Sequence, residues 1–72
     1  MERDWQGHVK GLLKSEIKRK QLSYRDLAER LTAMGIPENE TNIRTKISRG
    51  GFTAVFFIQC LEAIGVKELR LG

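Results

Sequence analysis

The amino-acid sequence predicts a single all-α domain of four helices over residues 1–72. Three observations predict this fold class. Apolar residues recur every three to four positions in four segments, side chains that cap helix N-termini precede three of these segments, and glycines follow two of them. Hydrophobic residues make up 40% of the 72 residues, which is enough for one small core, and we expect no second domain.

The first helix is expected from about Asp4 to Lys20. Asp4 can accept hydrogen bonds from the free backbone N–H groups of the first turn. Basic residues in the last turn suit the negative C-terminal end of the helix dipole. The apolar residues of this segment share one helical face. They are Trp5, Val9, Leu12, Leu13 and Ile17.

The second helix is expected to begin after Ser23, which caps it together with Asp26 in a capping box. Its inward stripe closes at Met34, and Gly35 suits the left-handed conformation that commonly follows a helix. The small Ala28 suits a close crossing with another helix. The stripe consists of Leu27, Ala28, Leu31 and Met34.

The third helix is expected over Glu40–Arg49, with Asn39 as its cap and Gly50–Gly51 after its end. Its apolar anchors are only Ile43 and Ile47, one turn apart. A helix with so narrow an apolar stripe has a wide polar face. We therefore expect this helix to lie at the surface, held to the core by two side chains.

The polar face of the third helix has the composition of a surface that reads DNA. Short hydroxyls and an amide can read base edges in the major groove, and cations can hold phosphates. The alternative is a face that is merely solvated. The partner helix in front and the basic run Lys18–Lys20 favour DNA. Opposite the two isoleucines lie Thr41, Asn42, Thr45, Ser48 and Arg49, with Arg44 and Lys46 on the flanks.

The fourth helix is expected over Thr53–Ile64, where apolar residues cover most of the circumference. Such a helix is the hub of the core, or part of it forms a subunit contact. We expect Phe56 or Phe57 to be fully buried, and Cys60 to be a buried, unreactive thiol. The tail, Val66–Gly72, is expected to form a final turn of helix or a short strand.

The chain is basic, with a formal net charge of +4. Residues 10–49 contain ten basic and five acidic residues, so the excess of positive charge is concentrated there. A basic small domain attracts polyanions, nucleic acid before anionic lipid. A solvated basic surface without a partner is the alternative.

The residue types that enzymes use are sparse. His8 is the single histidine and is expected at the surface, no Cys/His set has metal-ligand spacing, and no phosphate-binding glycine loop is present. We expect no enzyme activity, no cofactor and no small-molecule substrate. The longest apolar run, Ala54–Ile58, is far shorter than the ~20 residues of a membrane span. The N-terminus lacks the order of a signal peptide, so we expect a cytoplasmic protein without a membrane partner.

Three short motifs stand out along the chain: Ser23 with Leu27-Ala28, Ile47-Ser48-Arg49-Gly50, and Leu61-Glu62-Ala63-Ile64-Gly65-Val66. With these motifs the chain resembles, from Leu12 to Val66, the lambda-repressor-like (Xre-type) helix-turn-helix domains, and it is similar to a small bacterial family of unknown function in that superfamily. Two departures from the pattern are Ser48, where the superfamily usually has an acid, and a longer turn over Gly35–Thr41.

The resemblance implies a four-helix lambda-repressor-like fold that binds DNA. It also implies phosphate contacts at the N-termini of the second and fourth helices, and therefore at Tyr24, Arg25 and Thr53. Helix N-termini favour anions because their N–H groups are free and the dipole is positive there.

Together these features predict a non-catalytic, sequence-specific binder of double-stranded DNA, a transcriptional regulator acting as a homodimer. Surplus apolar residues for the dimer contact are Phe52, Val55, Leu69 and Leu71. The alternative is a protein-interaction module, adaptor or antitoxin-like, that keeps the fold without DNA readout and uses Phe52, Phe56 and Phe57. Base readout is expected from Thr41, Asn42, Thr45 and Arg49, and phosphate contact from Lys20, Tyr24, Arg25, Arg44, Lys46 and Thr53.

Overall fold

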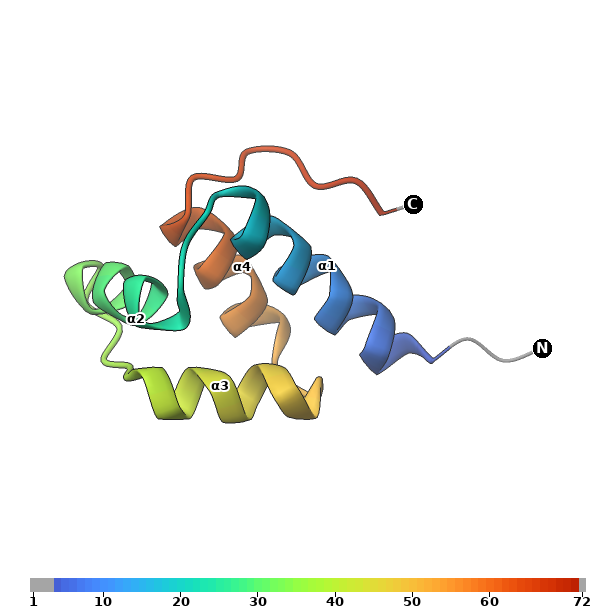
Figure 1. Ribbon diagram of the computed structural model, residues 1–72, viewed down its shortest axis with the longest axis horizontal. Helices are drawn as coiled ribbons and strands as arrows, with labels where there is room; N and C mark the ends of the chain where they lie inside the picture. Colours follow the sequence, from blue (N-terminus) through green and yellow to red (C-terminus); the bar gives the residue numbers. More distant parts are fainter. Residues whose placement is uncertain (1–3, 72) are drawn as a thin grey trace.

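The computed structural model describes residues 4–71, which are all-helical with no strand in that range. The four expected helices are present and are joined by short connections (Figure 1). No helix in this part of the chain is long and apolar enough to cross a membrane. The helices are α1 (Trp5–Arg19), α2 (Tyr24–Ala33), α3 (Glu40–Arg49) and α4 (Ala54–Ala63).

Each helix begins at a side chain that accepts a hydrogen bond from the backbone N–H three residues further on. This satisfies one of the N–H groups that the first helical turn leaves without a partner. The expected caps of the first three helices are confirmed. The four cap residues are Asp4, Ser23, Asn39 and Thr53.

The capping box at the start of α2 makes the stability of the protein depend on pH. The backbone N–H of Ser23 donates to Asp26 Oδ2 over 2.9 Å, and the N–H of Asp26 donates to Ser23 Oγ over 3.1 Å. Hydrogen bonds from Ser23, first its backbone and then its hydroxyl, lower the pKa of Asp26 below its ordinary value of 3.8. A carboxyl group with a lowered folded-state pKa stabilises the fold above its unfolded-state pKa, and this contribution is lost as the pH falls through the folded-state pKa.

We therefore expect Asp26→Asn to lower the Tm at neutral pH and to flatten the loss of Tm on acidification below about pH 4. Thermal unfolding followed by circular dichroism between about pH 2 and about pH 7 measures both effects. Parallel acid profiles for the variant and the wild type would show that this carboxylate does not contribute to the pH dependence.

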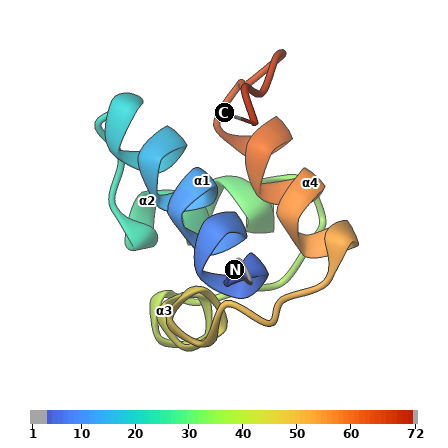
Figure 2. The ribbon, with the colours of Figure 1, turned by 90° about the vertical axis from the view of Figure 1, so that its right-hand side faces the viewer.

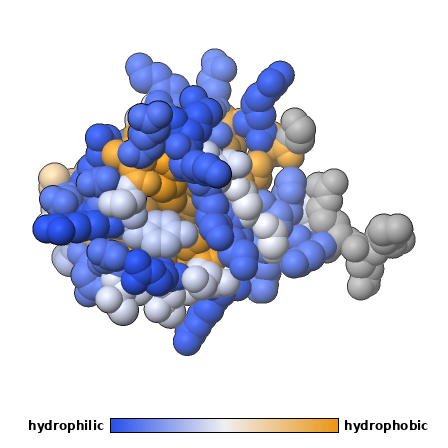
Figure 3. Space-filling model, viewed as in Figure 1, coloured by the Kyte–Doolittle hydropathy of each residue, from blue (hydrophilic) through white to orange (hydrophobic). Residues whose placement is uncertain are grey.

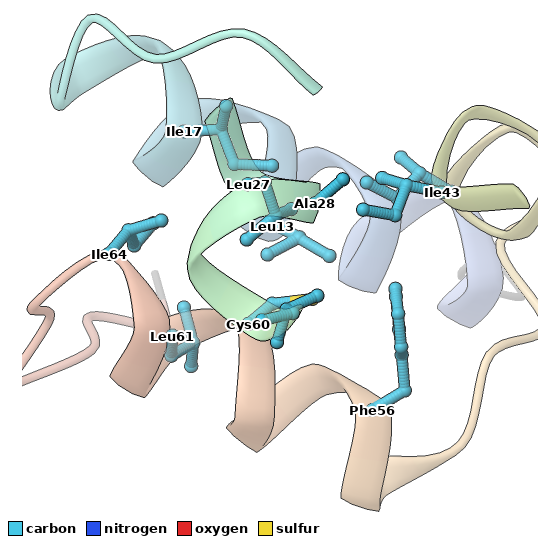
Figure 4. Packing of buried hydrophobic residues seen from close by; sticks show 11 residues of the cluster. Leu13, Ile17, Leu27, Ala28, Ile43, Phe56, Cys60, Leu61 and Ile64 are labelled. Carbon is cyan, nitrogen blue, oxygen red and sulfur yellow. The ribbon is translucent and has the colours of Figure 1, made fainter. Parts of the chain in front are cut away.

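One hydrophobic core lies between the four helices, and α1 and α2 each pack against α3 and α4. Figure 4 shows side chains from all four helices pointing into it. Ile43 and Ile47, the expected anchors of α3, have no exposed surface. The buried members are Leu13, Ile17, Leu27, Ala28, Leu31, Ile43, Ile47, Phe56, Cys60, Leu61 and Ile64.

Two of the residues expected on inward faces are exposed. Trp5 exposes 66% of its surface and Met34 exposes 46%. Both lie at helix ends, Trp5 at the first position of α1 and Met34 at the C-cap of α2. The apolar periodicity of the sequence continues into the first or last turn of a helix, where these two side chains are not covered by the core.

Within one copy of the chain α4 is buried on one side only, so it is not the hub buried on several sides that was one expectation, and a subunit contact by part of α4 stays a prediction. Phe56 is buried as expected, with 6% exposed, and Phe57 is half-buried. Val55 and Ile58, however, expose 66% and 53% of their surfaces. Because α4 packs against α1 and α2 at the edge of the fold, its opposite side has no helix over it.

Cys60 is fully buried, as expected. Burial, with a smaller contribution from the negative charge of Glu38, raises the pKa of its thiol to about 12. Because the thiolate is the nucleophilic form, this cysteine is unreactive in the folded protein at neutral pH.

The segment after α4 forms neither the helical turn nor the strand expected from its sequence. Residues 66–71 are irregular, and Gly72 lies outside the described residues. Val66 and Leu69 nevertheless pack against the core, which holds this segment over the fold. A lone strand has no partner for its backbone groups, and residues 4–71 offer none.

The turn after α3 requires a glycine. Gly50 has a φ of +72°, in the left-handed region, and a Cβ atom there would lie 3.1 Å from the backbone oxygen of Gln6. Glycine at this position therefore allows the start of α1 to approach the end of α3 closely. The expected end of α3 at Gly50–Gly51 is confirmed.

Candidate nucleic-acid interface

α3 lies along one side of the molecule and has a helix N-terminus on each side of it. Figure 2, which views α3 almost end-on, shows the first turn of α2 on one side and the start of α4 on the other. Both N-termini present positive helix-dipole ends. An extended anion along α3 would therefore meet favourable partial charges at both edges.

The outward face of α3 is polar, and the side chains expected to read bases project from it. Thr41, Thr45 and Arg49 are exposed, and within residues 4–71 none of their side chains has a hydrogen bond or ion pair. Asn42 is also exposed, and its backbone N–H, not its side chain, donates to Asn39 Oδ1 over 2.8 Å. Its side-chain amide has no hydrogen-bond partner among the described residues. The structure therefore brings all four expected base-reading residues together on one surface.

Arg44 links α3 to the start of α2. One of its guanidinium nitrogens lies 2.7 Å from Glu40 Oε2, and the guanidinium carbon lies 6.0 Å from the centre of the Tyr24 ring. The aromatic face attracts the cation at this distance. Arg25, one residue further along α2, is exposed and only loosely paired, 3.9 Å from Glu29. Three expected phosphate contacts, Tyr24, Arg25 and Arg44, therefore lie together on one edge of α3.

Thr53 lies on the other edge, at the start of α4. Its hydroxyl oxygen accepts the backbone N–H of Phe56 over 3.0 Å. The N-terminus of α4 therefore keeps its other first-turn N–H groups for an outside partner. Thr53 is the residue of this helix at which the resemblance implies a phosphate contact.

Lys46 is directed toward the protein rather than away from it. Its ammonium group pairs with the Glu38 carboxylate and lies 4.9 Å from the centre of the Phe56 ring. The Glu38 side chain is only 6% exposed, and its second carboxylate oxygen is buried with no hydrogen-bond partner among the described residues. The charge of Lys46 is therefore largely neutralised by an internal carboxylate.

Glu38 was missed by sequence reasoning. It lies in the turn before α3, eight residues from Lys46 along the chain, so the pair does not have the spacing of a pair within one helix. The Glu38 carboxylate meets the Lys46 ammonium group only because the turn between α2 and α3 folds back against α3. The only feature of the sequence that drew attention to this region was the length of the turn before α3.

Lys20, expected to contact phosphate, lies apart from the other candidate residues. Its Nζ lies 3.5 Å from the backbone oxygen of Gly65, just after α4. Figures 1 and 2 show the C-terminal ends of α1 and α4 on the side of the molecule opposite to α3. A lysine from the start of α1 reaches α3 instead, because Lys10 Nζ donates to the backbone oxygen of Ser48 over 3.1 Å.

The three phenylalanines do not form the exposed patch that the interaction-module alternative needs. Phe56 is buried, while Phe52 and Phe57 are half-buried and pack against the core. The rings of Phe52 and Phe57 stack on each other with 6.0 Å between their centres. Much of the surface of Phe52 and Phe57 is therefore covered by contacts with each other and with the core.

A groove of about 540 Å³ lies along α1 and reaches the start of α2, and its lining includes Lys10 and Tyr24, which also contact α3. Figure 3 shows apolar atoms among hydrophilic ones on the face of the molecule drawn in Figure 1. The groove is open and its rim is basic, with Lys10, Lys14 and Lys18 along α1. No group of three or more His, Cys, Asp or Glu residues in the described part of the chain is placed to hold a metal ion.

One family model, described as a domain of unknown function (DUF6471), matches residues 5–69. The match spans all four helices and every candidate residue discussed above. Searches of curated proteins and of solved structures found no match.

Proposed function

The chain belongs to the family described as a domain of unknown function (DUF6471), and from its own surface we propose that it binds double-stranded DNA without catalysis, by inserting α3 into the major groove. In this proposal α2 and α3 form a helix-turn-helix unit of the lambda-repressor-like kind. The biological role that fits is sequence-specific transcriptional regulation.

The observation that carries the proposal is the uncommitted outward face of α3. Other charged side chains of α2 and α3 have carboxylate partners, Arg25 with Glu29, Arg44 with Glu40 and Lys46 with Glu38. On the outward face, Asn42, Thr45 and Arg49 have donors and acceptors without partners in residues 4–71. An amide, a hydroxyl and a guanidinium are the groups that read adenine, mixed bases and guanine from the major groove.

The edges of α3 support the proposal because they suit two phosphate strands. One edge holds Tyr24, Arg25 and Arg44 beside the N-terminus of α2, and the other holds Thr53 at the N-terminus of α4. A groove-bound helix needs phosphate contacts on both sides to fix its orientation. Lys46 and Lys20 are not part of this proposal, since one is paired internally and the other lies on the opposite side.

We expect Arg49→Ala to weaken binding to a preferred duplex by about 1–3 kcal/mol and to relax base preference at one position. Lys20→Ala removes the same charge on the opposite side of the molecule and is the matched control, with little effect expected. Arg49 is exposed and Lys20 is half-buried with one long contact to Gly65, so little change in folding is expected, and thermal unfolding checks this.

The measurement starts from a random pool of duplexes, from which bound sequences are selected with the wild type. Affinities of wild type and variants for a selected duplex and for a scrambled duplex are then measured at two salt concentrations. DNA binding requires affinity that falls steeply with salt. If Arg49→Ala lost the same affinity for both duplexes, the proposal that α3 reads bases would be wrong. No binding of the wild type at low salt would reject the proposal and favour the interaction module.

A further inference from the structure

We propose that two copies of this chain associate through the outward side of α4 and the hollow beside it. The side of α4 opposite to Phe56 carries two large exposed apolar residues, Val55 and Ile58, 66% and 53% exposed. They lie three positions apart and therefore share one helical face. Exposed aliphatic residues that cluster on one face mark an interaction surface more often than scattered ones do.

The same face contains a hollow of about 280 Å³ next to Ile58, between α4 and the segment that follows it. Leu61, Val66 and Leu69 give it an apolar lining. In a two-fold dimer each copy presents the same patch, so a patch that carries both a projection and a hollow is complementary to itself. Val55, one turn before Ile58, is the projection that enters the hollow of the second copy.

The charges around this hollow favour a second copy over another kind of partner. Its rim carries Glu62, Lys67 and Glu68, so both signs are present, in contrast to the basic excess of residues 10–49. Across a two-fold axis Lys67 of one copy can meet an acidic group of the other. A nucleic acid or an acidic partner would instead prefer the basic surfaces elsewhere.

This face also places the two copies of α3 suitably for one duplex, a point that rests on the proposed DNA-binding function. The start of α4 flanks α3, and α1 and α2 lie on the inner side of α4 (Figure 2). Cα atoms span 20 Å in the shortest dimension, so two copies side by side span about 40 Å. DNA half-sites one helical turn apart are about 34 Å apart, so the two copies of α3 could reach both half-sites within a pair of that width.

The interface is small, which sets the strength we expect. Stable interfaces bury about 800 Å² per partner, and ten residues of α4 with a short tail offer less than that. Association in free solution is therefore weak and appears at high protein concentration. On DNA the second copy binds at a raised effective concentration, so the dimer forms there more readily.

Sedimentation equilibrium and amide chemical shifts of the full chain test this, with dilution from about 1 mM to about 10 µM. We expect the mean mass to rise above the monomer value of 8.2 kDa at high concentration. Concentration-dependent shifts should be confined to residues 54–62 and 66–69. Ile58→Lys should weaken association at least about tenfold, because the charge is buried twice in a two-fold contact. Met34→Lys, at another exposed apolar residue, is the control and should associate like the wild type.

A single 8.2 kDa species at about 1 mM, shifts located elsewhere, or Ile58→Lys associating like the wild type would each overturn the proposed interface. A separate measurement of binding to a random duplex at low salt distinguishes failure of the proposed interface from failure of the proposed DNA binding. A wild type that associates without binding the duplex keeps the interface and loses the function. A monomer that binds the duplex keeps the function and loses the interface.

Discussion

Phe56→Ala is expected to lower the free energy of unfolding by about 3–5 kcal/mol, the usual cost of removing a buried phenylalanine. The ring is 6% exposed and is contacted by the Lys46 ammonium group and by the ring of Phe52, 5.7 Å away between centres. Its removal leaves a cavity between the first turn of α4 and the core. In a chain of 72 residues that cost is most of the total stability.

Urea unfolding followed by circular dichroism measures this effect, with Phe57→Ala as the matched control. Phe57 is half-buried, so its truncation should cost less than half as much. If Phe56→Ala is unfolded without denaturant, Phe56→Leu keeps the comparison measurable, with an expected loss of about 1 kcal/mol. Equal losses for Phe56→Ala and Phe57→Ala would show that α4 is not held mainly by Phe56.

Lys46→Met is expected to lower the free energy of unfolding by about 2–3 kcal/mol, near the lower end for breaking a buried ion pair. The Glu38 carboxylate is only 6% exposed and already has one oxygen without a hydrogen-bond partner in the described residues. Without Lys46 this charge is buried with no compensation. The cost is below the full value because Lys46 itself is 45% exposed.

The double variant Glu38→Gln/Lys46→Met should recover most of this loss, because the uncompensated charge is then absent. Arg44→Met breaks the exposed pair with Glu40 and is the control, with an expected cost of about 0.5 kcal/mol or less. If Lys46→Met costs no more than Arg44→Met, the Glu38 pair does not stabilise the turn before α3. This outcome would also return Lys46 to the residues available for phosphate.

The sequence by itself determined the helices and the outward face of α3. Caps such as Ser23 and Asn39 act on N–H groups within one turn of themselves. Gly35 and Gly50 end their helices through their own backbone conformation. With Ile43 and Ile47 inside, the helical repeat alone placed Thr45 on the opposite face. All of these features depend on interactions within about four residues along the chain, so sequence reasoning could reach them.

Only the tertiary structure decided which sides of the helices are covered and which charges meet. In the sequence of α4, apolar residues cover nearly the whole circumference of the helix. Val55 and Ile58 are nevertheless exposed to solvent, because no helix packs on that side. Lys46 turns inward to Glu38, and Lys20 lies by Gly65 on the far side from α3. These outcomes depend on contacts between residues distant in sequence, which hydrophobic periodicity does not encode. Burial and ion pairing follow from how the helices are arranged around one another, and this arrangement left the face of α3 open between two helix N-termini.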